Sequence, residues 1–338
     1  MLKKLMILVV GMGLFSAMCI LASGQQSDAA DKKSIYWIGK TLNNPWWVMV
    51  KDIAVREAAE LGVDITTNMP EEEVDIVKQV RMIETAIEEK ADAIVVSAIH
   101  SRGVIPVLQR AKEVGIPIIN FDTRIADPTI AKAFVGADDV AGAYKAGKYI
   151  CEKLGGKGEV ALLEGLLEQS TGVDRRAGFL KAIEEYPDIK LVASFPAAWR
   201  TELALDATVY MLAAHPEIDA IFACNDQMAI GMVSGVYAAG RDPKELILVG
   251  YDGILEAARM VLEGDLDAFV ALPTREEGRM GMRLAVTSLL HPEFEFPREI
   301  IFPGPCVAKE FEKGLTDETI FEYISRVFPL MGVTETGY

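Results

Sequence analysis

The chain is poor in cysteine and histidine, with four cysteines and three histidines among 338 residues. Once the N-terminal export signal described below is removed, an odd number of cysteines remains, without paired spacing: Cys151, Cys224 and Cys306. This pattern argues against a disulfide framework and against a zinc site, so we expect no metal. The histidines are scattered along the chain, which argues against a catalytic cluster.

Basic residues are also scarce relative to acidic ones. Lys and Arg number 34 against 50 Asp and Glu, which gives a formal net charge of −16. Such an acidic surface repels phosphate backbones and anionic lipids, so we expect no nucleic-acid partner. The glycine patterns that bind nucleotide phosphates, and the G-x-S-x-G turn of hydrolases, are missing where strands lead into helices. We therefore expect neither an enzyme nor a bound cofactor.

The N-terminus differs in composition from the rest of the chain. Residues 1–24 contain two lysines, a long apolar run and a small-residue exit, and residues 25–34 are mostly polar. This order is typical of a cleaved secretory signal followed by a linker, with an uncleaved membrane anchor as the alternative. Cys19 raises the further alternative of a lipid-anchored protein, but residues 16–18 match a lipoprotein box poorly. We therefore expect simple export.

Beyond this linker, short apolar runs rich in β-branched residues alternate with helical patterns. The strand-like runs occupy residues 35–38, 63–67, 93–97, 116–121, 132–136, 158–163, 191–195, 220–224, 246–251, 267–272 and 299–302. Helical spacing of apolar residues marks residues 45–61, 72–89, 104–114, 139–153, 175–185, 203–214, 227–239 and 276–290. This alternation predicts an α/β fold with two doubly wound parallel sheets. A short C-terminal helix with Thr316 as its cap is also expected.

Residues 39–47 read GKTLNNPWW and lie where the first strand leads into the first helix. Pro45 suits the first helical position, and Asn44 suits the cap before it. Ligands of open α/β sheets bind at the carboxyl edge of the strands, where this segment lies. We expect Trp46 or Trp47 to offer a flat apolar face to a ligand. The alternative is a hydrophobic staple that only stabilises the helix.

Polar side chains follow the strands of both predicted sheets: Asp122 and Arg124, then Asn225, then Tyr251 with Asp252. Each alone could be a helix cap, but strand ends from two sheets facing one cleft would form a ring of hydrogen-bonding groups beside aromatic rings. Such a ring suits a neutral polyhydroxylated ligand, because carboxylates and carboxamides bond adjacent hydroxyls while indole covers the C–H face. Lys40, Arg124 and Arg175 add positive charge, so a sugar acid also fits. The alternative for Arg175 is a surface residue at the start of a helix.

Four motifs resemble those of the ribose-binding-protein-like family of periplasmic substrate-binding proteins, which serve sugar ABC transporters and share a fold with the core of the lactose-repressor family. The motifs are TLNNPWW at residues 41–47, DRRAGF at 174–179, FACND at 222–226 and VGYDG at 249–253. The likeness spans residues 35 to about 309. It implies ligand contacts from Asn44, Trp46, Trp47, Asp122, Arg175, Asn225 and Asp252, with Tyr251 beside the last and Trp199 as a further aromatic wall.

The chain departs from this family at three positions. Lys40 stands where a small hydroxyl residue is usual, Ser97 where an asparagine is common, and Leu272 near the place of a glutamine. We keep Lys40 and Ser97 as candidate ligand-binding residues. The resemblance therefore does not specify ribose.

The resemblance implies a type I periplasmic binding protein with two lobes joined by three hinge crossings, near Ala137, Pro273 and residues 303–305. The expected lobes comprise residues 35–137 plus 273–305 and residues 138–272 plus 306–330, with a tail at 331–338. The lobes would close on a small sugar or polyol, which an ABC transporter permease then receives. The alternative is the ligand-binding component of a sensing system that contacts a chemoreceptor or sensor kinase. Both imply a periplasmic protein, and we expect a monomer.

Overall fold

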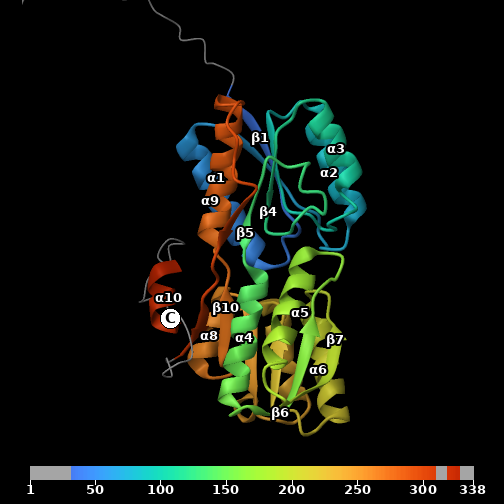
Figure 1. Cartoon of the computed structure of the whole chain (residues 1–338), viewed down its shortest axis with the longest axis vertical. Coiled ribbons are helices and arrows are strands. Elements are labelled where there is room, and N and C mark those ends of the chain that lie inside the picture. Colours follow the sequence, from blue (N-terminus) through green and yellow to red (C-terminus); the bar gives the residue numbers. More distant parts are fainter. Residues whose placement is uncertain (1–31, 310–317, 328–338) are drawn as a thin grey trace, which may run out of the picture. The chain divides into compact units, whose positions relative to one another are not determined.

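The computed structural model describes residues 32–309 and 318–327. The predicted signal, Cys19, the Thr316 cap and the tail lie outside the described residues. Within them, the strands form two sheets with helices on both faces of each, which confirms the predicted α/β class (Figure 1). No helix in this part of the chain combines the length and apolarity needed to cross a membrane.

The first sheet has the strand order β11-β5-β4-β3-β1-β2, and each neighbouring pair is parallel. Its strands are β1 (Ser34–Ile38), β2 (Asp64–Asn68), β3 (Ala93–Val96), β4 (Ile118–Phe121), β5 (Ala133–Ala137) and β11 (Glu299–Phe302). Its helices are α1 (Pro45–Leu61), α2 (Ile76–Glu88), α3 (Ile105–Glu113) and α9 (Thr274–Leu290). Helices α1 and α9 pack together on one face, and α2 and α3 on the other (Figure 1).

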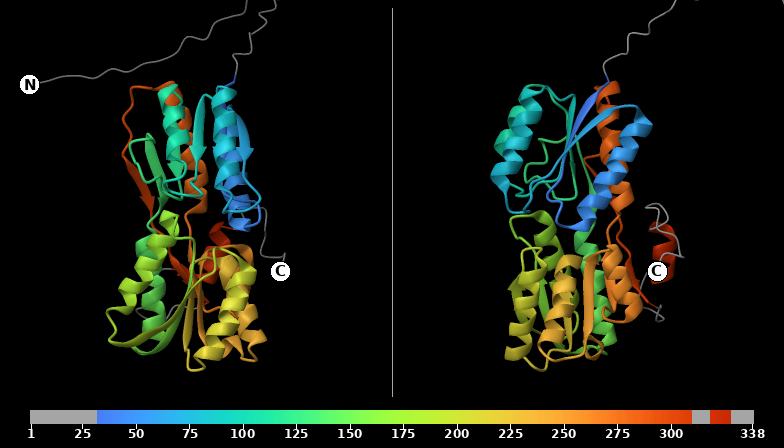
Figure 2. Two further views of the ribbon diagram at one scale, coloured as in Figure 1. Left: turned by 90° about the vertical axis from the view of Figure 1, so that its right-hand side faces the viewer. Right: turned by 180° about the vertical axis from the view of Figure 1, so that it is seen from behind.

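The second sheet has the order β13-β12-β10-β9-β8-β6-β7, with β12 antiparallel to β10. Its strands are β6 (Lys157–Glu164), β7 (Asp188–Pro196), β8 (Ala220–Ala223), β9 (Ile247–Asp252), β10 (Ala268–Ala271), β12 (Cys306–Ala308) and β13 (Glu318–Thr319). Its helices are α4 (Asp139–Lys153), α5 (Ser170–Ile183), α6 (Thr201–Ala214), α7 (Asp226–Ala238), α8 (Leu255–Glu263) and α10 (Ile320–Val327), with the 3-10 turn η1 (Pro243–Glu245). The pair α4 and α5 and the pair α6 and α7 lie on opposite sides of this sheet (Figure 2).

The described chain passes between the two sheets at three places. These are the β5 to α4, β10 to α9 and β11 to β12 connections. Each connection is only one to three residues long, so three short segments join the two lobes. We call the parts built on the first and second sheets the first and second lobes.

The start of α1 is built as its sequence predicts. Asn44 has an extended backbone, and its Oδ1 accepts a hydrogen bond from the Trp46 amide over 2.9 Å. Pro45 occupies the first turn, and Gly62 ends the helix in the left-handed region at φ +71°. Because Pro45 directly follows the cap, both tryptophans lie in the first turn, next to the carboxyl edge of β1.

Helix α5 differs from the prediction, because it starts at Ser170 and not near Arg175. Arg175 therefore lies in the second turn and is 4 % exposed, which corrects the alternative of a surface residue at a helix start.

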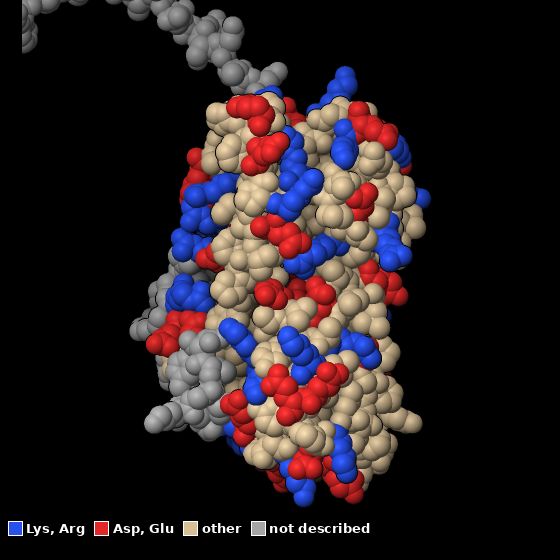
Figure 3. Space-filling model, viewed as in Figure 1, with Lys and Arg blue, Asp and Glu red and all other residues tan. Residues whose placement is uncertain are grey.

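Acidic and basic side chains are interspersed on the surface seen in Figure 3.

Candidate ligand-binding site between the two lobes

A cavity lies between the lobes, at the carboxyl ends of strands from both sheets. It is lined by Lys40, Asn44, Trp46, Trp47, Glu73, Asp122, Thr171, Arg175, Trp199, Asn225, Asp252 and Leu272. Most of the predicted site residues are therefore brought together. Three are not on this lining: Ser97, Arg124 and Tyr251.

The aromatic wall of the first lobe is Trp46 and Trp47, whose rings meet edge to face with centroids 4.7 Å apart. Trp46 Nε1 donates to Thr274 Oγ1 over 2.9 Å, and Trp47 packs against Phe121 with centroids 5.9 Å apart. Both indoles thus line the cavity and are also anchored in the lobe. Trp199 faces them from the second lobe, with its backbone in the left-handed region at φ +65°.

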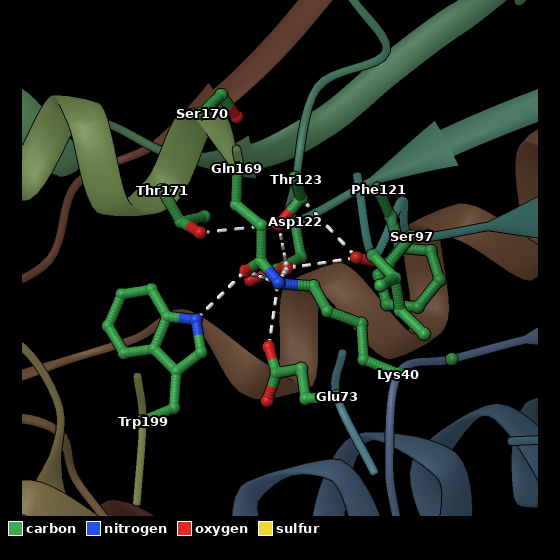
Figure 4. Close-up of polar contacts among 12 residues, drawn as sticks. Lys40, Glu73, Ser97, Phe121, Asp122, Thr123, Gln169, Ser170, Thr171 and Trp199 are labelled. Atoms are coloured by element: carbon green, nitrogen blue, oxygen red, sulfur yellow. Dashed lines mark hydrogen bonds and ion pairs between the residues drawn. The ribbon is translucent and has the colours of Figure 1, made fainter. Parts of the chain in front are cut away.

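The Lys40 ammonium is buried among acceptors (Figure 4). Its Nζ lies 3.2 Å from Asp122 Oδ2, 3.2 Å from Glu73 Oε1 and 2.8 Å from Gln169 Oε1. These three acceptors match the three N–H donors of an ammonium group. Burial raises the pKa of Glu73, although Lys40 beside it acts in the opposite direction.

Asp122 has one oxygen held by the protein. Its Oδ2 accepts hydrogen bonds from Ser97 Oγ over 2.9 Å and from Thr123 Oγ1 over 2.8 Å, besides its contact with Lys40. Oδ1 takes part in none of these bonds. The backbone at Asp122 is left-handed, with φ +55°. Ser97, predicted to touch a ligand, instead lies fully buried behind Asp122 and orients it.

Arg175 is the centre of the polar wall of the second lobe. Its Nε donates to Asp139 Oδ1 over 2.9 Å, and its Nη1 donates to Asp252 Oδ1 over 2.9 Å and to the Cys224 carbonyl over 2.8 Å. Burial works to lower the pKa of Arg175, but Asp139 and Asp252 outweigh it and leave this pKa well above its usual value. Nη2 takes part in none of these bonds.

Tyr251 lies beneath this guanidinium and not in the cavity. Its ring centroid is 4.0 Å from the Arg175 carbon, and its side chain is fully buried. Successive side chains of a strand point to opposite faces, so Tyr251 and Asp252 of β9 are directed apart. Tyr251 therefore supports Arg175 from below.

The residues after β8 and β9 are linked to each other. Asn225 caps α7 through a hydrogen bond from the Met228 amide over 2.9 Å, and it also lines the cavity. Asp226 accepts from the amides of Gly253 and Ile254 over 2.7 and 2.9 Å. Burial raises the pKa of Asp226 well above its usual value, and burial also raises the pKa of Asp252 to about 7.

Arg124 departs most from its predicted role. It pairs with Asp174 over 3.3 Å and with Glu299 over 3.2 Å, and its guanidinium stacks 4.3 Å from the Phe134 ring centroid. Because Asp174 belongs to the second lobe, this ion pair spans the seam between the lobes. Arg124 therefore joins the lobes outside the cavity.

Other hydrogen bonds cross the same seam. The Ser101 amide donates to the Glu168 carbonyl over 3.0 Å, and the Ser170 amide donates to Ser101 Oγ over 3.1 Å. The Arg124 amide donates to Ser170 Oγ over 2.8 Å. The lobes are thus closed against each other beside the cavity.

The fold agrees with that of known proteins. A family model described as the periplasmic binding protein domain matches residues 35–291. The chain is a periplasmic binding protein. This family is a class of substrate-binding proteins and not of enzymes.

Individual relatives of this periplasmic binding protein are sugar-binding proteins. The D-allose-binding periplasmic protein of Escherichia coli K12 is 37% identical over 254 residues, which cover 73% of this chain and 81% of that protein. A solved ABC transporter solute-binding protein from Actinobacillus succinogenes 130z, with bound D-allose, has a TM-score of 0.77 and 35% identity over 82% of this chain and 98% of that one. The fructose-binding periplasmic domain of a hybrid two-component system has a TM-score of 0.75 and 30% identity, covering 81% and 90%.

Sequence reasoning did not assign Glu73, Thr171 or Gln169 to the site of this periplasmic binding protein. Glu73 is one of three consecutive glutamates after β2, and nothing in the sequence distinguishes it from its neighbours. Its place after a strand of the first sheet was the available signal. Thr171 and Gln169 lie at the start of α5, which the sequence placed too late. No group of His, Cys, Asp and Glu in residues 32–309 and 318–327 has an arrangement suited to a metal ion.

Proposed function

We propose that this protein captures a single small sugar or polyol in the cavity between its lobes and delivers it to an ABC transporter permease. The observation that carries the proposal is the cavity wall. In the part of the chain that the structure describes, Asp122 Oδ1 and Arg175 Nη2 take part in none of the hydrogen bonds that hold these side chains, while indole rings line the same cavity. Fixed acceptors and donors bond ring hydroxyls, and indole covers the C–H face of a sugar.

D-Allose is the proposed ligand to test first. The relatives named above include a D-allose-binding protein and a structure that contains D-allose. Lys40 and Arg175 also leave a sugar acid as a ligand class to include.

Ligand capture is proposed to proceed by closure of the lobes about the three crossings. Residues of both lobes line the cavity, so a ligand makes its full set of contacts only when they are closed. The binding energy can therefore shift the protein toward the closed form, which the permease would recognise. The residues that line the cavity, apart from Leu272 and Thr171, are the proposed polar and aromatic contacts.

Isothermal titration of the mature protein tests this proposal. The panel is D-allose, D-ribose, D-fructose, myo-inositol and D-glucuronate. We expect saturable one-to-one binding of a monosaccharide, with the protein monomeric before and after. A mature protein that binds no member of the panel would overturn the proposal.

A sensing role is the second candidate, and one relative supports it. The fructose-binding neighbour is a domain of a two-component system. The same closed form could then be presented to a chemoreceptor or sensor kinase. Deletion of the coding sequence separates the two roles, because a transport role predicts loss of sugar uptake and a sensing role predicts loss of the response with uptake intact.

We propose that residues 1–24 direct export and are removed, which places the mature protein free in the periplasm. Anchoring through a lipid on Cys19 is the alternative. The mass of the mature N-terminal peptide distinguishes them, because lipidation would leave Cys19 as the first residue with an added acyl mass.

A further inference from the structure

Gln169 is buried in the seam between the lobes, and its side chain forms hydrogen bonds that the neighbouring helix does not require. It occupies the cap position before α5, yet its side chain makes no hydrogen bond to that helix. Its Oε1 accepts from Lys40 Nζ over 2.8 Å and from Trp199 Nε1 over 3.1 Å (Figure 4). The side chain therefore serves residues distant in the sequence.

The two donors come from different lobes. Lys40 follows β1 of the first lobe, whereas Trp199 lies between β7 and α6 of the second. The two side chains line opposite walls of the cavity, and one carbonyl oxygen joins them. Among the three acceptors around the Lys40 ammonium, Gln169 is the one that belongs to the second lobe.

The orientation of the amide follows from the same contacts. If the amide were turned over, its NH₂ group would face the N–H donors of Lys40 and Trp199, which is repulsive. Its Nε2 has no hydrogen-bond partner within the described residues, although it is buried. A buried amide with one idle group costs free energy, so its carbonyl contacts must offset that cost.

We propose that Gln169 is a positioning residue that ties Lys40 of the first lobe to Trp199 of the second, and so sets the binding geometry of the cavity when the lobes close. This inference deepens the proposed function and rests on it. When the lobes separate, Lys40 keeps Glu73 and Asp122 but loses Gln169, while Trp199 keeps Gln169. Closure thus completes the coordination of Lys40.

The test compares Gln169→Met with Ser170→Ala, using D-allose as the probe in isothermal titration. Methionine keeps the length of the side chain but removes the carbonyl, so we expect affinity to fall about tenfold or more. Ser170→Ala removes a neighbouring hydrogen bond across the seam without touching Lys40 or Trp199, so we expect a loss of about threefold or less. Equal losses in both variants would overturn the inference, because closure alone would explain them.

A double-mutant cycle with Lys40→Met separates positioning from general packing. If Gln169 acts through Lys40, the Gln169→Met change has little further effect once Lys40 is replaced. Independent, multiplying losses would overturn the inference, as would an unchanged affinity of Gln169→Met. Gln169→Leu carries the same expectations if the methionine variant does not fold.

If the proposed function is wrong, the titrations give a different result from the one expected when only the role of Gln169 is wrong. In that case the wild-type protein binds neither D-allose nor another sugar of the panel, and the inference falls with it. If the wild type and Gln169→Met both bind the sugar with the same affinity, the inference fails and the proposed function stands.

Discussion

Arg175 and Asp252 form a buried ion pair, with Nη1 and Oδ1 2.9 Å apart and both side chains about 5 % exposed or less. Such a pair is costly to bury unless its remaining groups are also bonded. Asp139 and the Cys224 carbonyl bond the same guanidinium, and Tyr251 packs beneath it. Because Arg175 is held from several sides, its position in the cavity wall is set before any ligand arrives.

The Asp252 carboxyl should contribute stability to the ligand-free protein that is lost as the pH rises from about 4 to about 7. Burial raises the pKa of Asp252 to about 7, whereas a free aspartate has a pKa of about 3.9. Between these values the folded protein holds a proton that the unfolded chain has released, so raising the pH removes a stabilising contribution. Urea midpoints at pH 4.5, 6 and 7.5 measure this decline.

Asp252→Asn should flatten part of that pH profile, since it removes one titrating group. Burial also raises the pKa of Asp139 and of Asp226, so the variant keeps the contributions of these two carboxyls to the profile. The matched control is Asp206→Asn, at an exposed position of α6, which should keep the wild-type profile. A wild-type slope in Asp252→Asn would show that another carboxyl is responsible.

Asp122→Asn should weaken sugar binding by about 1.5–3 kcal/mol, because it removes a charged acceptor from the cavity. The change also leaves Lys40 with Glu73 as its one carboxylate partner among the described residues. Isothermal titration with D-allose measures the effect, and Asp206→Asn again serves as the control. Wild-type affinity in Asp122→Asn would remove Asp122 from the proposed ligand contacts.

Most of the fold could be predicted because buried parallel strands and amphipathic helices leave clear periodic patterns. Helix α4 has the predicted bounds, Asp139–Lys153. Helix α5 was placed too late, since the predicted helix began at Arg175 and left out the first turn, which contains Gly172. A Cβ at Gly172 would lie 2.1 Å from the Leu166 carbonyl oxygen, so this glycine allows close packing within the helix start. The short helix α8, of nine residues, was missed between β9 and β10.

The site residues that directly follow a strand could be predicted from the sequence. The roles of residues one or two positions further along were harder to predict. The left-handed backbone at Asp122 turns the chain, so Thr123 points back to Asp122 while Arg124 reaches Asp174. A left-handed backbone is uncommon in residues other than glycine, so the spacing of residues in the sequence does not locate this turn. The role of Gln169 could not be predicted for a different reason, since its partners Lys40 and Trp199 contact it only in the folded chain.

Arg124→Ala should weaken sugar binding by less than about 1 kcal/mol, since partly exposed ion pairs contribute about 0–1 kcal/mol. The Arg124 and Asp174 side chains are 28% and 29% exposed, and their bond spans the seam outside the cavity. Titration at 50 and 500 mM salt checks that the ion pair is the cause. Salt screens the pair, so the sugar affinity of the wild type should fall toward that of the variant at 500 mM. A loss as large as that of Asp122→Asn would instead return Arg124 to the ligand contacts.

Trp46→Ala should weaken sugar binding by about 1–3 kcal/mol through loss of the indole face. Trp46→Phe is the matched control, because it keeps an aromatic face and removes the Nε1 hydrogen bond to Thr274. We expect the phenylalanine variant to retain most of the affinity, since stacking on the sugar needs the face and not the N–H group. Ligand titration, together with urea unfolding of the ligand-free variants, separates binding from packing. If Trp46→Ala binds like the wild type and is only less stable, the indole has a packing role alone, as a hydrophobic staple would require.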